Sequence, residues 1–138
     1  MRLWHKDLIP VLPRQQLLGQ WRECCAIAKN IHDNGTPNHI LVNPIMNYPE
    51  SMFNSYTNEV YHELQRRGYS PDWHCFQKNR DRDPLDCSSE HQYLFGGWHN
   101  DRYLTQCLAN LEEKHDRGGV SDEEWNDILQ YVARRKKK

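Results

Sequence analysis

Two neighbouring side chains, Arg22 and Glu23, could hold a phosphate and move a proton. They end the segment QQLLGQWRE, which spans residues 15–23. A guanidinium binds phosphate oxygens through paired N–H groups, and a carboxylate can stabilise a cation or transfer a proton. Gly19 lies in the same segment, although glycine inside a helix costs roughly 1 kcal/mol relative to alanine. Its presence indicates close approach of a backbone or a ligand, while a helix face that only meets water is the alternative.

The start of the chain offers a second reactive group. The opening sequence MRLW is apolar enough to dock against the rest of the protein, which would hold the α-amino group in a fixed position. An α-amine loses its proton near pH 8, roughly two units below lysine, so more of it is nucleophilic at neutral pH. Because Arg2 is bulky, we expect the initiator methionine to be retained. The candidate nucleophile is therefore the amine of Met1.

The elements that must position these groups are all predicted to be helical. In the first helix the apolar positions step by four and three residues, and Asn34-Gly35 supply its stop. Ser121 and Glu124 form a capping-box pattern at the start of the last helix. Four helices are predicted, at about 14–33, 49–67, 100–117 and from 121, with an ordered connector at 35–48 and a long irregular loop at 69–98. The fold class is all-α, with a small single domain at 1–133 and a basic C-terminal tail at 134–138.

Composition and charge limit the classes of function. The 138 residues (16.6 kDa) suffice for one domain, and the net charge is −1. The longest apolar stretch, Cys24 to Ala28, is far below the ~20 residues of a membrane helix. The start lacks the clean apolar region of a secretory signal, and the five cysteines suggest no disulfide framework. We therefore expect a monomeric cytoplasmic protein with no membrane partner.

Metal and nucleotide cofactors are not expected. The best metal-ligand candidates are His74, Cys75, Cys87 and His91. Structural zinc sites bring cysteines in close pairs, whereas Cys75 and Cys87 are separated by eleven residues. No phosphate loop or glycine-rich dinucleotide motif occurs either. These side chains are more simply explained as structural.

The segment QQLLGQWRE closely resembles the first-helix motif of the phage-type pyrimidine-dimer DNA glycosylases, known as endonuclease V. The opening MRLW is similar to the start of those enzymes. The second-helix ending ELQRRGY and the third-helix segment LEEK extend the resemblance over most of residues 1–117. The sequences MRLWHKDLIP and GQWREC look like a bacterial branch of this family. Two departures are Ala26, where the phage enzyme has a further arginine, and the end LQYVARRKKK, which lacks its aromatic segment.

This resemblance implies a small all-α repair enzyme that acts on damaged double-stranded DNA without a cofactor. The Met1 amine would attack the sugar C1′ and form a Schiff base, and Glu23, supported by Arg22, would assist displacement of the base and the strand-nicking lyase step. Pyrimidine dimers would be the lesion. The DNA-contacting residues would be Arg2, Lys6, Gln15, Gln16 and Lys29.

A non-catalytic helical module that binds DNA or protein is the alternative. In it, the third and fourth helices would form a helix-turn-helix joined at Arg117–Val120. The acidic run at residues 122–124 opens the fourth helix and would face DNA phosphates, which argues against this alternative. Blocking the α-amine separates the two hypotheses, because only catalysis requires it.

Overall fold

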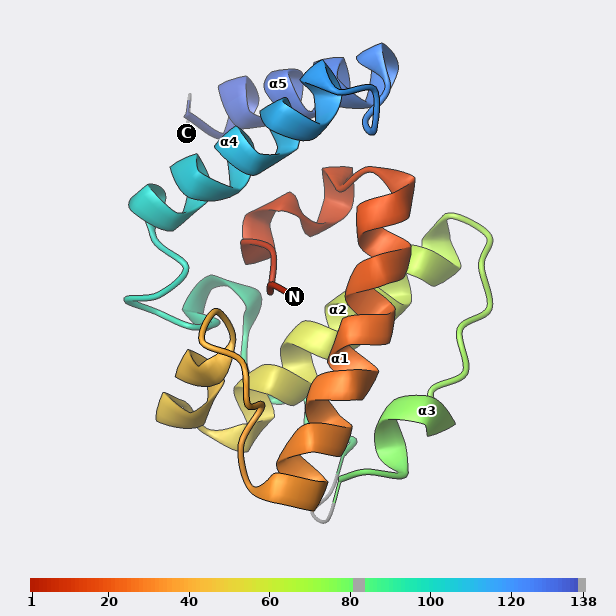
Figure 1. The fold of residues 1–138 in the computed structure, drawn as a ribbon, viewed down its shortest axis with the longest axis vertical. Helices are drawn as coiled ribbons and strands as arrows, with labels where there is room; N and C mark the ends of the chain where they lie inside the picture. Colours follow the sequence, from red (N-terminus) through yellow and green to blue (C-terminus); the bar gives the residue numbers. More distant parts are fainter. Residues whose placement is uncertain (81–83, 137–138) are drawn as a thin grey trace.

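The computed structural model describes residues 1–80 and 84–136, and within them it is all-helical, as predicted (Figure 1). No β-strand occurs in these residues. The α-helices are α1 (Arg14–Asn34), α2 (Glu50–Arg66), α3 (His74–Gln77), α4 (Asp101–Asp116) and α5 (Asp122–Lys136). Three short 3₁₀-helices are η1 (Lys6–Val11), η2 (Asn43–Asn47) and η3 (His91–Tyr93).

Helix α1 carries the Arg22–Glu23 pair, and its boundaries follow from local chemistry. Pro13 precedes its first turn, where a missing N–H costs nothing. Gly35 ends it at φ 75°, a left-handed conformation that glycine adopts freely, and its N–H donates to the Ile31 carbonyl at 2.8 Å. The predicted apolar stripe is buried: Leu17, Trp21, Cys24 and Ala28 face the core, together with Ile27 and Gln20.

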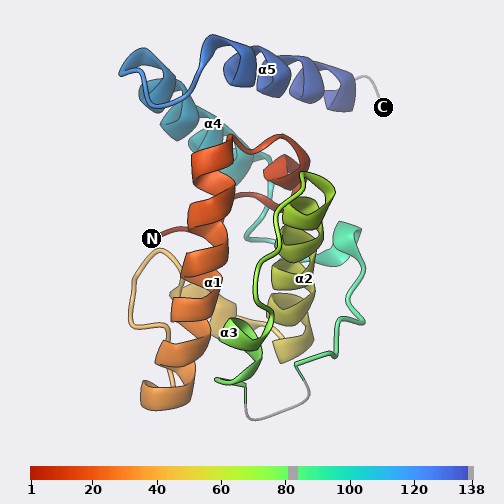
Figure 2. The same ribbon diagram turned by 90° about the vertical axis from the view of Figure 1, so that its right-hand side faces the viewer.

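The N-terminal segment (residues 1–5) runs through the middle of the molecule. Helices α1 and α2 lie side by side, and in Figures 1 and 2 the chain start passes beside α1 and beneath α4. Leu3 and Trp4 are buried within the hydrophobic core, which confirms that the chain start docks. The segment then enters η1, a helix the sequence did not predict, where Leu8 and Ile9 are buried.

The region 69–98 is more ordered than the sequence predicted. It contains α3 and η3, and Phe76, Leu94 and Phe95 in it are fully buried. Elements of three or four residues are too short to produce a helical period, so the sequence reads as a loop there. Residues 81–83 of this predicted loop lie outside the described residues.

Helices α4 and α5 form an antiparallel hairpin over the top of the molecule (Figure 1). The predicted capping box is confirmed: the Ser121 amide donates to Glu124 Oε1 and the Glu124 amide donates to Ser121 Oγ, both at 3.1 Å. Helix α5 continues to Lys136, so the basic residues at 134–136 extend a helix instead of starting a tail. Residues 137–138 of the predicted tail lie outside the described part of the chain.

Candidate active site

Gln20 on α1 ties the N-terminal segment to the helix. Its side chain is 1% exposed. Its amide oxygen accepts from the Trp4 N–H at 2.8 Å, and its amide nitrogen donates to the Arg2 carbonyl at 3.0 Å. The Tyr56 hydroxyl of α2 donates to the same amide oxygen at 3.0 Å. One side chain thus supplies hydrogen bonds that the backbone of an extended segment would otherwise make to a neighbouring β-strand.

Other side chains pair with further backbone groups of the chain start. Tyr56 also donates to the Trp4 carbonyl at 2.6 Å. The Tyr103 hydroxyl of α4 donates to the Leu3 carbonyl. The Lys6 N–H donates to Nδ1 of the buried His99 at 2.9 Å. Helices α1, α2 and α4 together therefore determine where the chain begins.

Glu23 on α1 is hydrogen-bonded to the start of the chain. Its Oε2 accepts from the Arg2 N–H at 3.3 Å, and its side chain is partly buried. Because one residue spans about 3.5 Å, the Met1 nitrogen lies at most about 7 Å from this carboxylate. Met1 itself is 38% exposed. A carboxylate and an accessible amine therefore share one site.

Arg2 lies at the edge of a recess beside this pair. Its guanidinium carbon is 5.7 Å from the Trp4 ring centroid and 6.0 Å from that of Tyr103, distances at which a cation is attracted to an aromatic face. The recess has a volume of about 580 Å³ and separates the connector after α1 from the start of α4. Its lining residues are Arg2, Ile40, Leu41, Pro44, Gly97, Trp98, Asn100, Arg102, Tyr103, Gln106 and Asn110. Two arginines and no carboxylate line it.

Arg22 is exposed on α1, one turn after Gly19. A Cβ on Gly19 would meet only the Arg22 guanidinium within 4 Å, with Nη2 at 3.8 Å. That is an ordinary contact distance, so packing within the protein does not require glycine there. Among the described residues nothing else approaches this point. The space over Gly19 is therefore open to a partner molecule.

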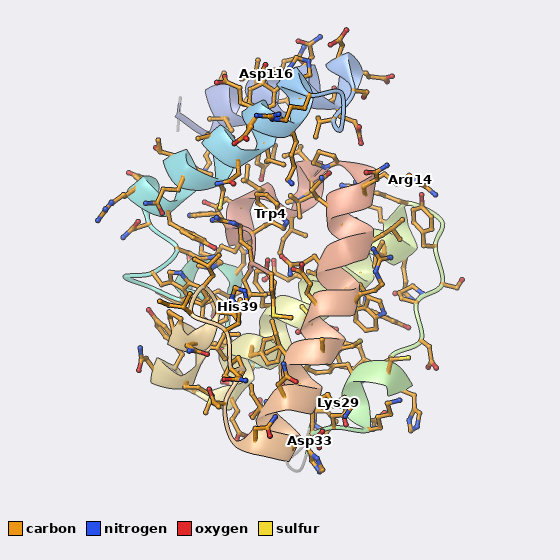
Figure 3. The ribbon with its side chains drawn as sticks, in the orientation of Figure 1. Trp4, Arg14, Lys29, Asp33, His39 and Asp116 are labelled. Carbon is orange, nitrogen blue, oxygen red and sulfur yellow. The ribbon has the colours of Figure 1, made fainter. Side chains whose placement is uncertain are left out.

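The other predicted contact residues divide into those that face solvent and one that does not. Gln15 and Lys29 are exposed, and Gln16 is half-buried. Lys29 donates to Asp33 at 2.8 Å near the far end of α1, where Figure 3 shows both side chains. Lys6 is 8% exposed, so the structure does not bring it to the surface with the others.

Lys6 instead belongs to a charge cluster around Asp7. The Asp7 carboxylate accepts from Lys6 Nζ at 3.0 Å, from His91 Nε2 at 2.9 Å and from Arg135 Nε at 2.7 Å. These bonds, that of His91 first, hold the Asp7 pKa far below its usual range, and the bond to Asp7 raises the His91 pKa to about 9. The cluster joins η1, η3 and α5, so it helps to hold the segment that carries Met1.

Buried aromatic and imidazole groups surround the N-terminal segment. His5 and His99 stack with ring centroids 5.2 Å apart. Burial lowers the pKa of His5 to about 4 and that of His99 to about 2, so both rings are neutral. Burial likewise raises the pKa of Tyr103 well above its usual range, which keeps its hydroxyl a donor to Leu3. These imidazole and phenol groups beside the segment are thus uncharged near neutral pH.

The family model for pyrimidine dimer DNA glycosylase matches residues 1–77, more than half of the chain. The chain belongs to this family. Membership assigns it the role of a DNA glycosylase in DNA repair, with DNA as its substrate. Comparisons with curated proteins and with solved structures found no match. The match ends within α3, short of the residue 117 that we expected from sequence, yet it includes Met1, Arg2, Gln20, Arg22 and Glu23.

Sequence reasoning missed the residues that position this glycosylase site. The sequence analysis gave Gln20, Tyr56 and Tyr103 no role in the site. A single buried polar position within an apolar helix face was the available signal for Gln20, because buried amides require partners.

The described residues also answer two questions about other sites. No group of three His, Cys, Asp or Glu among them could hold a metal ion, and His91 of the candidate zinc set is bonded to Asp7 and Glu59. Within the same residues, none of the helices combines the length and apolar character that crossing a bilayer requires.

Proposed function

We propose that this glycosylase cleaves pyrimidine-dimer DNA through a covalent intermediate on the Met1 amine. The observation that carries the proposal is the 3.3 Å hydrogen bond from the Arg2 N–H to Glu23, because it sets the amine beside the carboxylate. The amine nitrogen forms a bond to C1′ as the C1′–N bond to the damaged base breaks, and the departing base takes the bonding electrons. The sugar ring then opens to a Schiff base, its ring oxygen taking a proton.

Glu23 serves both stages in this proposal. Its negative charge stabilises the cationic sugar while the glycosidic bond breaks, and it carries protons for the later step. In β-elimination a proton leaves C2′, the C3′–O bond breaks, and the phosphate departs on the downstream strand. The product is a nicked strand with the sugar remnant still bound to Met1, which hydrolysis then releases.

The arginines and the recess support binding of a distorted duplex. Arg2 follows the proposed nucleophile directly in the chain, and Arg22 precedes Glu23 on α1. Both would contact phosphate, with Gln15, Gln16 and Lys29 along α1 as further contacts. Lys6 is not included, because Asp7 already neutralises it in the interior. Sugar C1′ is shielded in stacked DNA, so a nucleotide must be extruded, and about 580 Å³ is within the range of small-molecule sites.

Borohydride trapping tests this proposal. Wild type is incubated with a duplex carrying one abasic site and with one carrying one thymine dimer, and reduction converts a Schiff base into a stable adduct. We expect an adduct on both, mapped by mass spectrometry to Met1. Glu23→Gln should slow formation and strand cleavage by roughly 10²–10⁴-fold, the usual contribution of a proton-transferring group. Glu112→Gln, an exposed carboxylate on α4, should react like wild type.

A second protein with two residues added before Met1 isolates the nucleophile. This extended chain should fold and bind DNA but form no adduct. Normal nicking of abasic DNA by the extended chain would show that another group attacks C1′. Binding without any adduct from a folded wild type with a free amine, verified by intact mass, would support the helical binding module instead.

A further inference from the structure

The connector between α1 and η2 presents two apolar side chains to solvent. Ile40 is 83% exposed and Leu41 is 46% exposed, while Val42, the next residue, is fully buried. We propose that Ile40 and Leu41 form an apolar wedge that enters the base stack of DNA beside the damaged nucleotide. This inference rests on the proposed function, because it assigns the residues that open the substrate of the same site.

The wedge is held by a rigid turn. The His39 carbonyl accepts from the Val42 N–H at 3.0 Å and from the Asn43 N–H at 2.8 Å. The Asn43 side chain in turn accepts from the His39 N–H at 3.0 Å. Buried Val42 and Ile45 anchor the turn in the protein. A preorganised turn loses little conformational freedom on binding, so its exposed side chains can act as fixed probes.

The wedge lies next to the proposed nucleophile. Ile40, Leu41 and Arg2 line the same recess. In Figures 1 and 2 the connector after α1 lies beside the chain start, and Figure 3 shows His39 in that connector below Trp4. A base step that receives Ile40 would therefore have its sugar close to Met1.

The charge around the wedge favours a polyanion as the molecule that binds in the recess. Across the recess from the wedge lie Arg102 and Trp98, and no carboxylate lines the space, although the chain carries 19 acidic residues. Cationic and amide side chains contact phosphates, whereas apolar wedges such as Ile, Leu and Met separate base steps in proteins that kink DNA. Both kinds of group meet here, so DNA fits this surface better than an apolar protein partner.

The chemical need for a wedge follows from the reaction. Attack on C1′ requires the stack to open at the lesion, and an inserted side chain fills the gap that an extruded nucleotide leaves. Burying Ile40 between bases recovers apolar contact that solvent exposure denies it in the free protein. The recess then receives the displaced nucleotide, because it opens directly beside the turn.

The test compares Ile40→Ser and Leu41→Ser with Leu129→Ser, an apolar residue on α5 that is 47% exposed. The first probe is a duplex with a thymine dimer and 2-aminopurine next to it, whose fluorescence rises when the base unstacks. The second is a single-stranded abasic oligonucleotide for borohydride trapping, in which no base pair has to open. All three side chains face solvent, so the variants should melt within a few degrees of wild type.

We expect Ile40→Ser to reduce the fluorescence rise at saturating protein and to slow single-turnover cleavage of the dimer duplex by roughly ten- to hundredfold, the value of one buried apolar side chain. Leu41→Ser should have a smaller effect in the same direction. Trapping on the single strand should stay within about twofold of wild type for both variants. Leu129→Ser should match wild type in every assay.

Three results would overturn the wedge. The first is an Ile40→Ser protein that unstacks and cleaves the duplex like wild type. The second is an equal loss of activity on duplex and single-stranded substrates. The third is self-association of wild type that Ile40→Ser abolishes, which would make this surface a protein contact. If wild type forms no adduct on any DNA, the proposed chemistry fails, and the fluorescence of the two variants still decides the role of the wedge.

Discussion

Replacing Gln20 by leucine should weaken the protein and displace its proposed nucleophile. Leucine retains most of the volume at this buried position but leaves the Trp4 N–H and the Arg2 carbonyl without partners. An unpaired buried backbone group costs roughly 1–3 kcal/mol, so the loss in unfolding free energy should be about 2–5 kcal/mol. Releasing the N-terminal segment instead would expose Leu3 and Trp4, whose burial contributes roughly 1.5–3 kcal/mol each. Undocking the segment would therefore not recover the lost unfolding free energy.

Urea unfolding followed by tryptophan fluorescence measures the first effect. With a slope of about 2 kcal/mol per molar urea, the middle of the usual range, the midpoint should fall by roughly 1–2.5 M. Catalysis is measured as single-turnover trapping on abasic duplex at saturating DNA, under conditions where the variant is folded. A displacement of the amine by about 1 Å can cost roughly a hundredfold in rate, while DNA affinity should change little. A lower trapping rate at unchanged DNA affinity distinguishes displacement of the amine from a general loss of structure.

The matched stability control is Gln16→Leu, the same change one turn earlier on α1. The Gln16 amide oxygen is buried without a hydrogen-bond partner among the described residues, so its loss should leave the urea midpoint unchanged or raise it. If Gln20→Leu unfolded at the same urea concentration as wild type and trapped abasic DNA at the same rate, Gln20 would not hold the chain start as we reason. Equal destabilisation by the two variants would likewise assign the effect to the helix face and not to the hydrogen bonds.

Three further predictions follow from the same geometry. Gly19→Ala should raise the unfolding free energy by about 0.5–1 kcal/mol, because the added Cβ makes only an ordinary contact. The same change should reduce DNA affinity in a filter-binding titration. Unchanged affinity would mean that DNA does not approach Gly19. Urea stability should be greatest near pH 6.5. Below it the unfolded chain protonates His5 and His99, which burial keeps neutral in the folded state, so stability falls towards pH 4. Above pH 6.5 the stabilisation from protonated His91 is lost as the pH rises through about 9. An unfolding free energy that stays constant from pH 6.5 to 9.5 would contradict the Asp7–His91 bond. Asp7→Asn should cost about 3–5 kcal/mol in unfolding free energy, because it leaves the buried Lys6 cation uncompensated, and a thermal melt within 2 °C of wild type would rule this out.

Local patterns predicted the long helices correctly. The apolar stripe of α1, its stop at Gly35 and the capping box at Ser121 each depend on residues within one or two turns. The Arg22–Glu23 pair could be recognised for the same reason. Short elements such as η1 and α3 were missed, because their residues are buried by distant contacts and no period builds up within so few positions.

The environment of each charge was not readable from the sequence. Lys6 was expected at the surface as a phosphate contact, yet it lies buried against Asp7, whose other partners are 84 and 128 residues away. A lysine next to an aspartate has the same local pattern whether it faces DNA or the interior. Only the packing of η3 and α5 on η1 decides between them.

By itself, the sequence determined that this chain is helical, that its first helix carries an adjacent arginine and glutamate, and that its start is apolar enough to dock. Those properties are local, since periodicity and side-chain chemistry act over a few residues. The tertiary structure decided where the amine lies. The bond from Tyr103 to Leu3 spans 100 residues and that from Gln20 to Trp4 spans 16, so the meeting of amine and carboxylate depends on how α1, α2 and α4 pack.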